Sequence, residues 1–183
     1  SVAATLAKFS MDVCLYMSQN FDFISLPAHL TTGSSIMPHK KNPDVFELIR
    51  GKCNIIQALP YEITLITNNL PSGYHREFQL LKEGLFPAIQ NLKACLDIAI
   101  FSIKDIKVKD NILADPKYNY LFTVDTLNEM VVAGMPFRDA YKAVAKQLEN
   151  GTYESPKATQ HTHEGSINNL CLKEIKEKMH NAF

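Results

Sequence analysis

Three long stretches in the first hundred residues carry apolar side chains at steps of three and four. They cover about residues 1–20, 43–69 and 76–104. This spacing places the apolar side chains along one face of an α-helix. Long helices joined by turns are typical of an elongated bundle. The pattern therefore predicts an all-α fold built on a long-helix bundle.

Two prolines, Pro60 and Pro87, lie inside the second and third stretches. Proline removes one helical hydrogen bond and crowds the preceding turn. Because the apolar pattern continues on both sides of each proline, we expect a local bend rather than the end of a helix.

The predicted elements become shorter after residue 105. We expect a brief extended piece at 106–108 and helices over about 117–132, 136–150 and 172–179, with Gly134 and Gly151 as stop signals. The chain is therefore expected to form two domains. Residues 1–104, with a long irregular loop at 27–43, would be part of the bundle. Residues 105–183 would form a small C-terminal helical domain.

The charge balance excludes some partners. The 19 lysines and arginines equal the 19 acidic residues in number. No overall basic field therefore attracts nucleic acid or an anionic membrane. No apolar run approaches the ~20 residues that span a bilayer. The four cysteines form no CxxC pair, so we expect small core residues in a reducing, cytoplasmic protein. The first residue is Ser1, inside a helical pattern, and we expect the chain to be a fragment.

The segment 33–43 carries the chemistry. It brings two hydroxyls, up to three cationic groups and the start of a helix into eleven residues. A helix N-terminus and lysines both favour negative charge, so the segment predicts a site for a carboxylate or phosphate. A solvated basic turn before a helix is the alternative. Asn42 before Pro43 is also a good helix cap.

The same string resembles the signature of the fumarase/aspartase superfamily. It reads Gly33-Ser34-Ser35-Ile36-Met37-Pro38-His39-Lys40-Lys41-Asn42-Pro43, and the family form is Gly-Ser-Ser-x-Met-Pro-x-Lys-x-Asn-Pro. Segments 44–50, 74–82 and 134–140 resemble the argininosuccinate lyase branch in particular. The likeness covers about residues 1–150 and would make this chain the C-terminal portion of such a lyase. His75 is a departure, since the family often has asparagine there.

The resemblance implies roles for individual residues. Ser34 matches the catalytic base, Lys40 the cation that neutralises the developing carboxylate charge, and Glu47 an acidic member of the site. The positions matched to substrate contacts are Thr32, Ser35, Met37, Asn42, Tyr74, Gln79 and Lys82. No cofactor is implied. We expect no metal either, because no set of carboxylate or cysteine ligands accompanies His161 and His163.

The resemblance also implies an activity: β-elimination of argininosuccinate to arginine and fumarate, a step of arginine biosynthesis. Family members form homotetramers whose active sites are shared between subunits, so the isolated chain is expected to be inactive. Two alternatives stay open. The protein could be another lyase of the superfamily, such as an adenylosuccinate lyase or aspartase. It could also be a structural lens protein with the same bundle and no catalytic role.

Overall fold

The computed structural model describes residues 1–156 and 161–182. The chain divides into two compact units, Ser1–Asp110 and Asn111–Phe183. Six α-helices make up most of the described residues, with one pair of two-residue strands. The predicted all-α fold class is confirmed.

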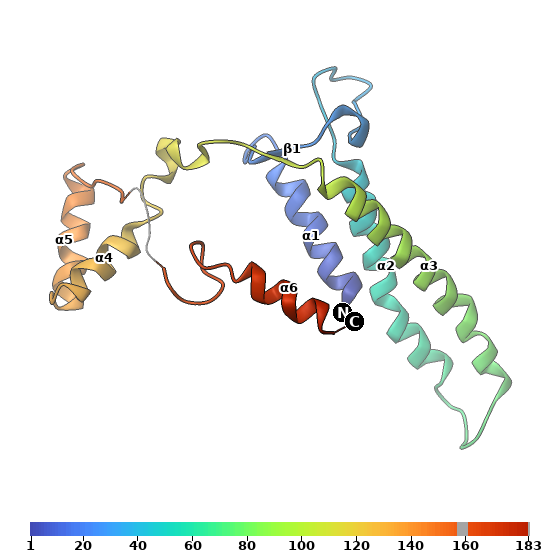
Figure 1. Ribbon diagram of the computed structural model, residues 1–183. Helices are drawn as coiled ribbons and strands as arrows, with labels where there is room; N and C mark the ends of the chain where they lie inside the picture. The colour runs from blue at the N-terminus through green and yellow to red at the C-terminus, as the bar shows by residue number, and fades with distance from the viewer. Residues whose placement is uncertain (157–160, 183) are drawn as a thin grey trace. The chain divides into compact units, whose positions relative to one another are not determined.

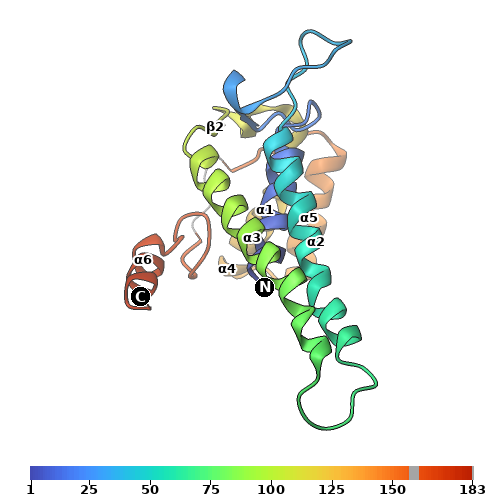
Figure 2. The same ribbon diagram turned by 90° about the vertical axis from the view of Figure 1, so that its right-hand side faces the viewer.

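Three long helices lie side by side in the first unit: α1 (Val2–Tyr16), α2 (Asp44–Ile66) and α3 (Leu81–Ile103). In Figures 1 and 2, α2 and α3 form an antiparallel hairpin that extends well beyond α1. The three predicted helices are confirmed, and Pro60 and Pro87 lie inside α2 and α3. The third begins later than expected, because residues 76–79 form a separate 3-10 helix, η2 (Arg76–Gln79).

The first helix ends four residues earlier than the sequence pattern predicts. The chain reverses after Tyr16, whose carbonyl accepts a hydrogen bond of 2.8 Å from the backbone N–H of Phe23. The rings of Tyr16, Phe21 and Phe23 pack on one another in this turn, with centroids 5.4–6.4 Å apart. Asp22 takes a positive φ of 48° between them. Aromatic packing therefore favours the turn over continued helix.

The buried core of the first unit lies toward one end of the helix hairpin. Its α2 members are Phe46, Ile49 and Cys53, all within the first half of that helix. Its α3 members are Cys95, Ala99 and Ser102, all within the second half. Residues of α1 complete this core: Ala3, Leu6, Ala7, Ser10 and Val13. Because α2 and α3 run antiparallel, these halves face each other beside α1 (Figure 1).

The other halves of α2 and α3 leave large apolar side chains exposed. They include Ile55, Tyr61, Leu65, Leu85, Phe86 and Ile89, which are 37–75 % accessible. Exposure of so many apolar groups along one hairpin is uncommon for a surface that faces only water. This apolar surface of the hairpin is therefore suited to contact with another protein surface.

One helical segment is long and apolar enough to span a bilayer when only length and composition are considered. In that sense the expectation that no segment could do so is wrong. The helical stretch Arg76–Ile103 is long and apolar enough to pass that test. Core helices of bundles pass it as well. Here the charged residues Lys82, Glu83, Lys93 and Asp97 lie between the apolar positions of the helix, which is the pattern of an amphipathic bundle helix.

The chain around the predicted irregular loop at 27–43 is partly regular. The strand β1 (Ile24–Ser25) lies just before the loop, and a 3-10 helix, η1 (Ala28–Leu30), lies within it. Strand β1 pairs antiparallel with β2 (Lys107–Val108), which confirms the predicted extended piece. Leu26 and Leu30 are 4 % accessible and join the core. They anchor the segment on the helices, and β2 stays with the first unit.

The second unit is helical as predicted. Its elements are η3 (Ile112–Ala114), η4 (Pro116–Tyr118), α4 (Thr123–Val132), α5 (Phe137–Glu149) and α6 (Leu172–His180). Gly134 and Gly151 have positive φ and follow α4 and α5, which confirms both stop signals. The helix predicted over 117–132 begins later. The Asp115 side chain accepts a hydrogen bond from the backbone N–H of Lys117 and caps a separate turn.

Candidate active site

The loop that carries the signature is closed at its base. Thr32 and Asn42 form an antiparallel bridge, in which each backbone N–H donates to the other residue's carbonyl, at 3.1 and 2.8 Å. Residues 33–41 therefore project as one closed loop. A closed base limits the conformations open to the loop and holds its first and last residues side by side.

Two backbone N–H groups point at the hydroxyl oxygen of Ser34. The Oγ atom accepts hydrogen bonds from Ile36, at 3.2 Å, and from Met37, at 3.1 Å. Such donors favour negative charge on the oxygen that they address. Serine also makes bonds of this kind in ordinary turns. The geometry agrees with a serine that is deprotonated more easily than usual. An ordinary serine turn has the same bonds, so the other groups of the site decide between these two interpretations.

The predicted capping role of Asn42 is wrong. The N-cap of α2 is Pro43, and it makes no side-chain cap. The Asn42 amide nitrogen instead donates to the Gly33 carbonyl at 3.4 Å. The bridge to Thr32 holds Asn42 in an extended conformation outside the helix, so its side chain turns toward the loop. Asn42 therefore belongs to the base of the loop rather than to the helix.

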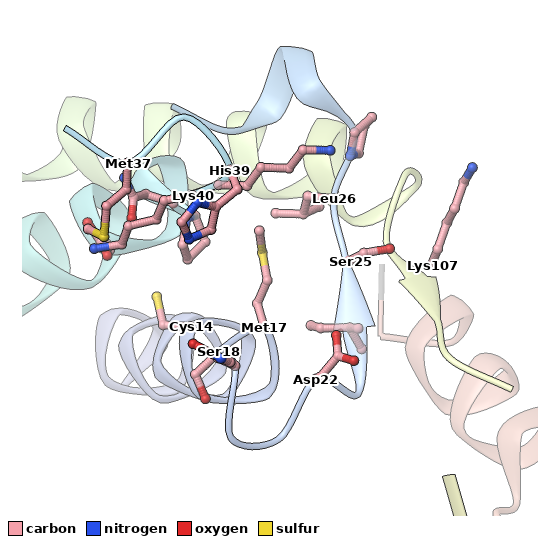
Figure 3. A pocket seen from close by; sticks show the side chains of 17 residues that line it. Cys14, Met17, Ser18, Asp22, Ser25, Leu26, Met37, His39, Lys40 and Lys107 are labelled. Carbon is pink, nitrogen blue, oxygen red and sulfur yellow. The ribbon is translucent and has the colours of Figure 1, made fainter. Parts of the chain in front are cut away.

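A hollow of about 920 Å³ lies between the loop, the C-terminal end of α1 and β1. Four of the predicted site residues line it: Met37, Lys40, Asn42 and Glu47. Thr32, Ser34 and Ser35 are not among its lining residues. Figure 3 shows His39 and Lys40 on the loop side of this hollow. The structure thus brings the cationic and amide groups of the motif to one hollow, with Ser34 on the loop beyond it.

Apolar residues of α1 and of the segment after β1 form the opposite wall. In Figure 3 the side chain of Met17, the residue directly after α1, points toward Leu26. Sequence reasoning missed these residues as part of the site. Their signal is that of any core residue in an amphipathic helix or strand, so nothing local marks them as lining a hollow.

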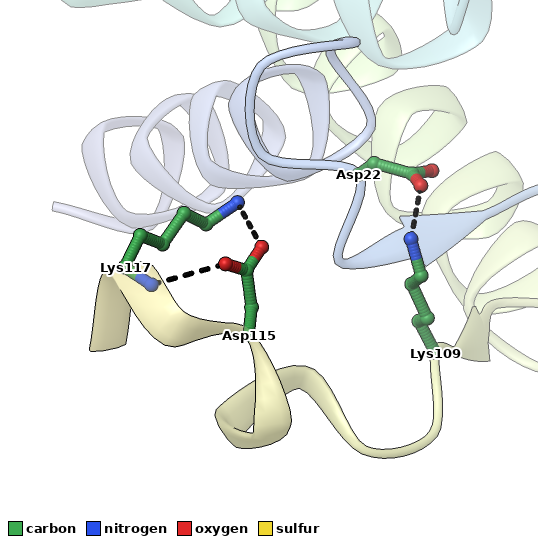
Figure 4. Close-up of polar contacts among 4 residues, drawn as sticks. All are labelled: Asp22, Lys109, Asp115 and Lys117. Carbon is green, nitrogen blue, oxygen red and sulfur yellow. Dashed lines mark hydrogen bonds and ion pairs between the residues drawn. The ribbon is translucent and has the colours of Figure 1, made fainter. Parts of the chain in front are cut away.

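The charges around the hollow favour an anionic ligand. Lys40, Lys41 and Lys107 line it, against the carboxylates of Glu47 and Asp22. Asp22 is already engaged in an ion pair with Lys109 (Figure 4). The two opposite charges of an ion pair largely cancel each other's electrostatic field at the hollow. The lysines therefore outweigh the one remaining acid, Glu47.

Glu47 occupies the first turn of α2, where the helix dipole favours an acid. Burial raises the pKa of the neighbouring Cys14 thiol, Arg50 opposes that rise, and Glu47 adds to it. Glu47 and Arg50 therefore both lie within electrostatic reach of α1. No ion pair joins the two within the described part of the chain.

A second cluster joins three of the remaining predicted site residues. The Gln79 amide nitrogen donates to the Tyr74 hydroxyl, and Lys82 Nζ donates to Gln79 Oε1 at 2.8 Å. All three side chains are exposed. The structure therefore connects a phenol, an amide and an ammonium group in one string, which we call the Tyr74 cluster. An ammonium group held in this way can pair with a carboxylate.

The Tyr74 cluster lies far from the signature loop within one chain. The two are joined by α2, whose 23 residues span about 34 Å at ~1.5 Å per residue. Figures 1 and 2 show the loop and the α2–α3 turn at opposite ends of the hairpin. One small molecule therefore cannot touch both groups of the same chain. The predicted site residues separate into two half-sites.

Comparison with known proteins gives close relatives. A protein-family model described as "Lyase" matches residues 1–58. An argininosuccinate lyase of Parabacteroides distasonis is 54% identical over 182 residues, which are 100% of this chain and 41% of that protein. An argininosuccinate lyase of Phocaeicola vulgatus is 52% identical over 179 residues, 98% of this chain and 40% of that protein. The chain thus spans about 40% of the length of these relatives.

Solved structures support the fold. An EDDS lyase variant with bound fumarate superposes with a TM-score of 0.65 at 20% identity, over 81% of this chain and 31% of that one. At this identity the likeness concerns the arrangement of the helices. The likeness therefore supports the observed arrangement of the helices and nothing finer.

Proposed function

Because this chain belongs to the argininosuccinate lyase family, within the fumarase/aspartase superfamily, we propose that the protein carrying it cleaves argininosuccinate to arginine and fumarate. The chain covers about 40% of its relatives, so the activity of the whole protein is inferred from them. Their 52–54% identity supports this substrate over those of adenylosuccinate lyase or aspartase.

The proposed reaction is a β-elimination. A base removes a proton from the carbon next to a carboxylate, and the electron pair spreads into that carboxylate. That pair then forms the C=C bond of fumarate as the C–N bond breaks. The electron pair of the C–N bond leaves with nitrogen, which takes up a proton. Stabilising the doubly negative carboxylate is the main task of such a site.

Ser34 is the proposed base. The single observation that carries this role is the pair of N–H groups, from Ile36 and Met37, that address its Oγ atom. They stabilise the deprotonated oxygen, and the nearby lysines add to the effect. Lys40 is proposed to neutralise the carboxylate as its charge grows, and Glu47 to belong to the same network. We assign no residue of this chain to protonation of the leaving nitrogen.

The remaining predicted residues are proposed to bind substrate. Thr32, Ser35, Met37 and Asn42 would surround the fumarate-like half from the signature loop. The Tyr74 cluster would bind another part of the substrate, with Lys82 paired to a carboxylate. Neither a cofactor nor a metal ion takes part in this proposal.

The proposal includes a homotetramer with active sites shared between subunits. Two observations support it. The exposed apolar surface of α2 and α3 is suited to burial against other copies. The length of about 34 Å between the signature loop and the Tyr74 cluster requires that one site draw them from different copies. The four free cysteines agree with a cytoplasmic location, which stays a prediction.

The test is a direct assay of the complete protein that carries this chain. Fumarate formation is followed by its ultraviolet absorbance with argininosuccinate, adenylosuccinate or aspartate as substrate. We expect turnover of argininosuccinate alone, from a species whose sedimentation mass equals four subunits. Faster turnover of another substrate would assign a different lyase. An intact tetramer with no turnover would favour the structural lens-protein alternative.

A further inference from the structure

The turn between α2 and η2 carries Tyr74 but has few bonds of its own. The last backbone hydrogen bond of α2 in this region runs from Asn68 to Leu65, and the next one joins Phe78 to His75. Within residues 1–156 and 161–182, no backbone–backbone hydrogen bond involves residues 69–74. Asn69 and Gly73 both have positive φ, which shapes the turn without closing it. Side chains must therefore hold it.

The His75 side chain closes this turn. Its Nε2 atom lies 2.9 Å from the carbonyl oxygen of Pro71. A carbonyl only accepts, so the imidazole must carry a proton on Nε2 and donate it. His75 is half-buried although its neighbours in the turn, Ser72 to Tyr74, are exposed. This side-chain bond spans the turn from residue 71 to residue 75, so its loss should let the turn open more easily.

The rings of His75 and Tyr74 share one packing partner, Phe78. His75 and Tyr74 both pack edge-on against Phe78, with ring centroids 6.5 and 5.9 Å away. Phe78 belongs to η2, the same short helix that ends at Gln79. The three rings therefore connect the closed turn to the helix that presents the amide partner of Tyr74.

We propose that His75 is a positioning residue for substrate binding, because its bond to Pro71 holds Tyr74 against Gln79 and Lys82. This inference rests on the proposed function, in which the Tyr74 cluster binds substrate. His75 itself does not contact the substrate. When the turn opens, Tyr74 leaves the string and the binding-competent fraction of the protein falls. Apparent affinity falls by the same factor.

The effect should appear in KM rather than in kcat. Loss of one hydrogen bond that holds the turn is expected to raise KM about three- to tenfold. The proposed base, Ser34, lies at the far end of α2, in a site completed by other copies. The proton abstraction should therefore keep its rate within about twofold once substrate is bound.

Two substitutions in the complete protein separate the hydrogen bond from the ring packing. His75→Gln keeps an N–H donor at similar reach without the ring, and His75→Phe keeps an aromatic ring without the donor. We expect His75→Gln to retain the KM of the unchanged protein within about twofold, and His75→Phe to raise it several-fold. His180→Phe, at the exposed end of α6, is the matched control and should change neither constant.

Hydrogen exchange of the peptide that covers residues 67–80 gives a second measurement that needs no lyase activity. The amides of Phe78 and Leu80, which donate backbone hydrogen bonds directly after the turn, should exchange faster in His75→Phe and at an unchanged rate in His75→Gln. If the unchanged protein fails to cleave argininosuccinate, the proposed function fails, and exchange alone decides whether His75 closes the turn. If His75→Phe does not fold, His75→Leu removes the donor with a smaller side chain.

Two results would overturn the proposal. One is a His75→Phe protein with unchanged KM and unchanged exchange. The other is a His75→Gln protein that loses affinity as much as His75→Phe does, since the ring and not its N–H would then be the essential group.

Discussion

The hydroxyl oxygen of Ser34 lies 3.1 Å from the backbone nitrogen of Met37, which donates a hydrogen bond to it. Ile36 donates a second bond at 3.2 Å. Both donors belong to the loop that Thr32 and Asn42 close. Because backbone donors in a closed loop need little reorganisation, they can stabilise charge on the serine oxygen as it forms.

Replacing Ser34 by alanine removes the proposed base. We expect kcat to fall by at least about a hundredfold in the complete protein, the usual range for loss of a positioned general base. Fumarate formation measures it. Stability should fall by only about 1 kcal/mol, because two N–H groups lose one partly exposed acceptor.

Ser155→Ala is the matched control for this experiment, because Ser155 is also half-buried but lies in the second unit. Its turnover should equal that of the unchanged protein. Undiminished turnover by a folded Ser34→Ala protein would contradict the role given to Ser34.

Mixing inactive variants tests whether the sites are shared. If each site takes its signature loop from one copy and its Tyr74 cluster from another, Ser34→Ala and Lys82→Ala subunits assembled in equal amounts should regain activity. Half of the loops and half of the clusters are intact, so about a quarter of the sites should work. Turnover after co-assembly measures this fraction.

Ser34→Ala mixed with Lys40→Ala is the control, since both changes lie on the same loop and every site then carries one of them. This mixture should stay inactive. Failure of the first mixture to exceed its two parent proteins, in assembled tetramers, would show that one chain supplies both half-sites.

A buried hydroxyl in α1 offers a test of stability. Ser10 is 0 % accessible, and its Oγ atom has no hydrogen-bond partner among the described residues. Burying a polar group without a partner is unfavourable, and alanine is the better helix former. Ser10→Ala should therefore raise the free energy of unfolding by about 1 kcal/mol. Denaturant titration measures it. Ser18→Ala, whose hydroxyl donates to Leu15, is the control that should give no gain.

The core thiol of Cys53 predicts a pH dependence. Burial raises its pKa from 9.0 to about 11, and the neighbouring Cys95 adds to the rise. The unfolded chain therefore loses this proton at lower pH than the folded one. Its contribution to stability is full below pH 9.0 and is lost as the pH rises toward about 11.

Chemical unfolding at pH 8 and at pH 10.5 measures this loss, which should reach up to about 2 kcal/mol. Cys53→Ala should lower stability at both values but reduce the difference between them. Lysines and tyrosines titrate in both proteins and cancel in the comparison. An equal decline in the two proteins would refute the assignment to Cys53.

The sequence alone determined the long helices and the chemistry-bearing loop. Apolar spacing predicts α2 and α3 because helix periodicity is a local property. The string from Gly33 to Pro43 is covalent and needs no fold to be seen. The capping alternative for Asn42 was wrong for a related reason, whereas its predicted role in substrate binding stays a prediction. A local rule favours capping by an asparagine before proline, but the nonlocal bridge to Thr32 holds Asn42 outside the helix.

Only the tertiary structure decided which of these residues can act together. It directed the N–H groups of Ile36 and Met37 at Ser34, and it joined Tyr74 to Gln79 and Lys82. It also placed these two groups at opposite ends of α2, although both match one active site in the sequence. The reason is physical. Side-chain spacing sets the face of a helix, whereas the path of a loop and the length of the helix before it set which groups meet.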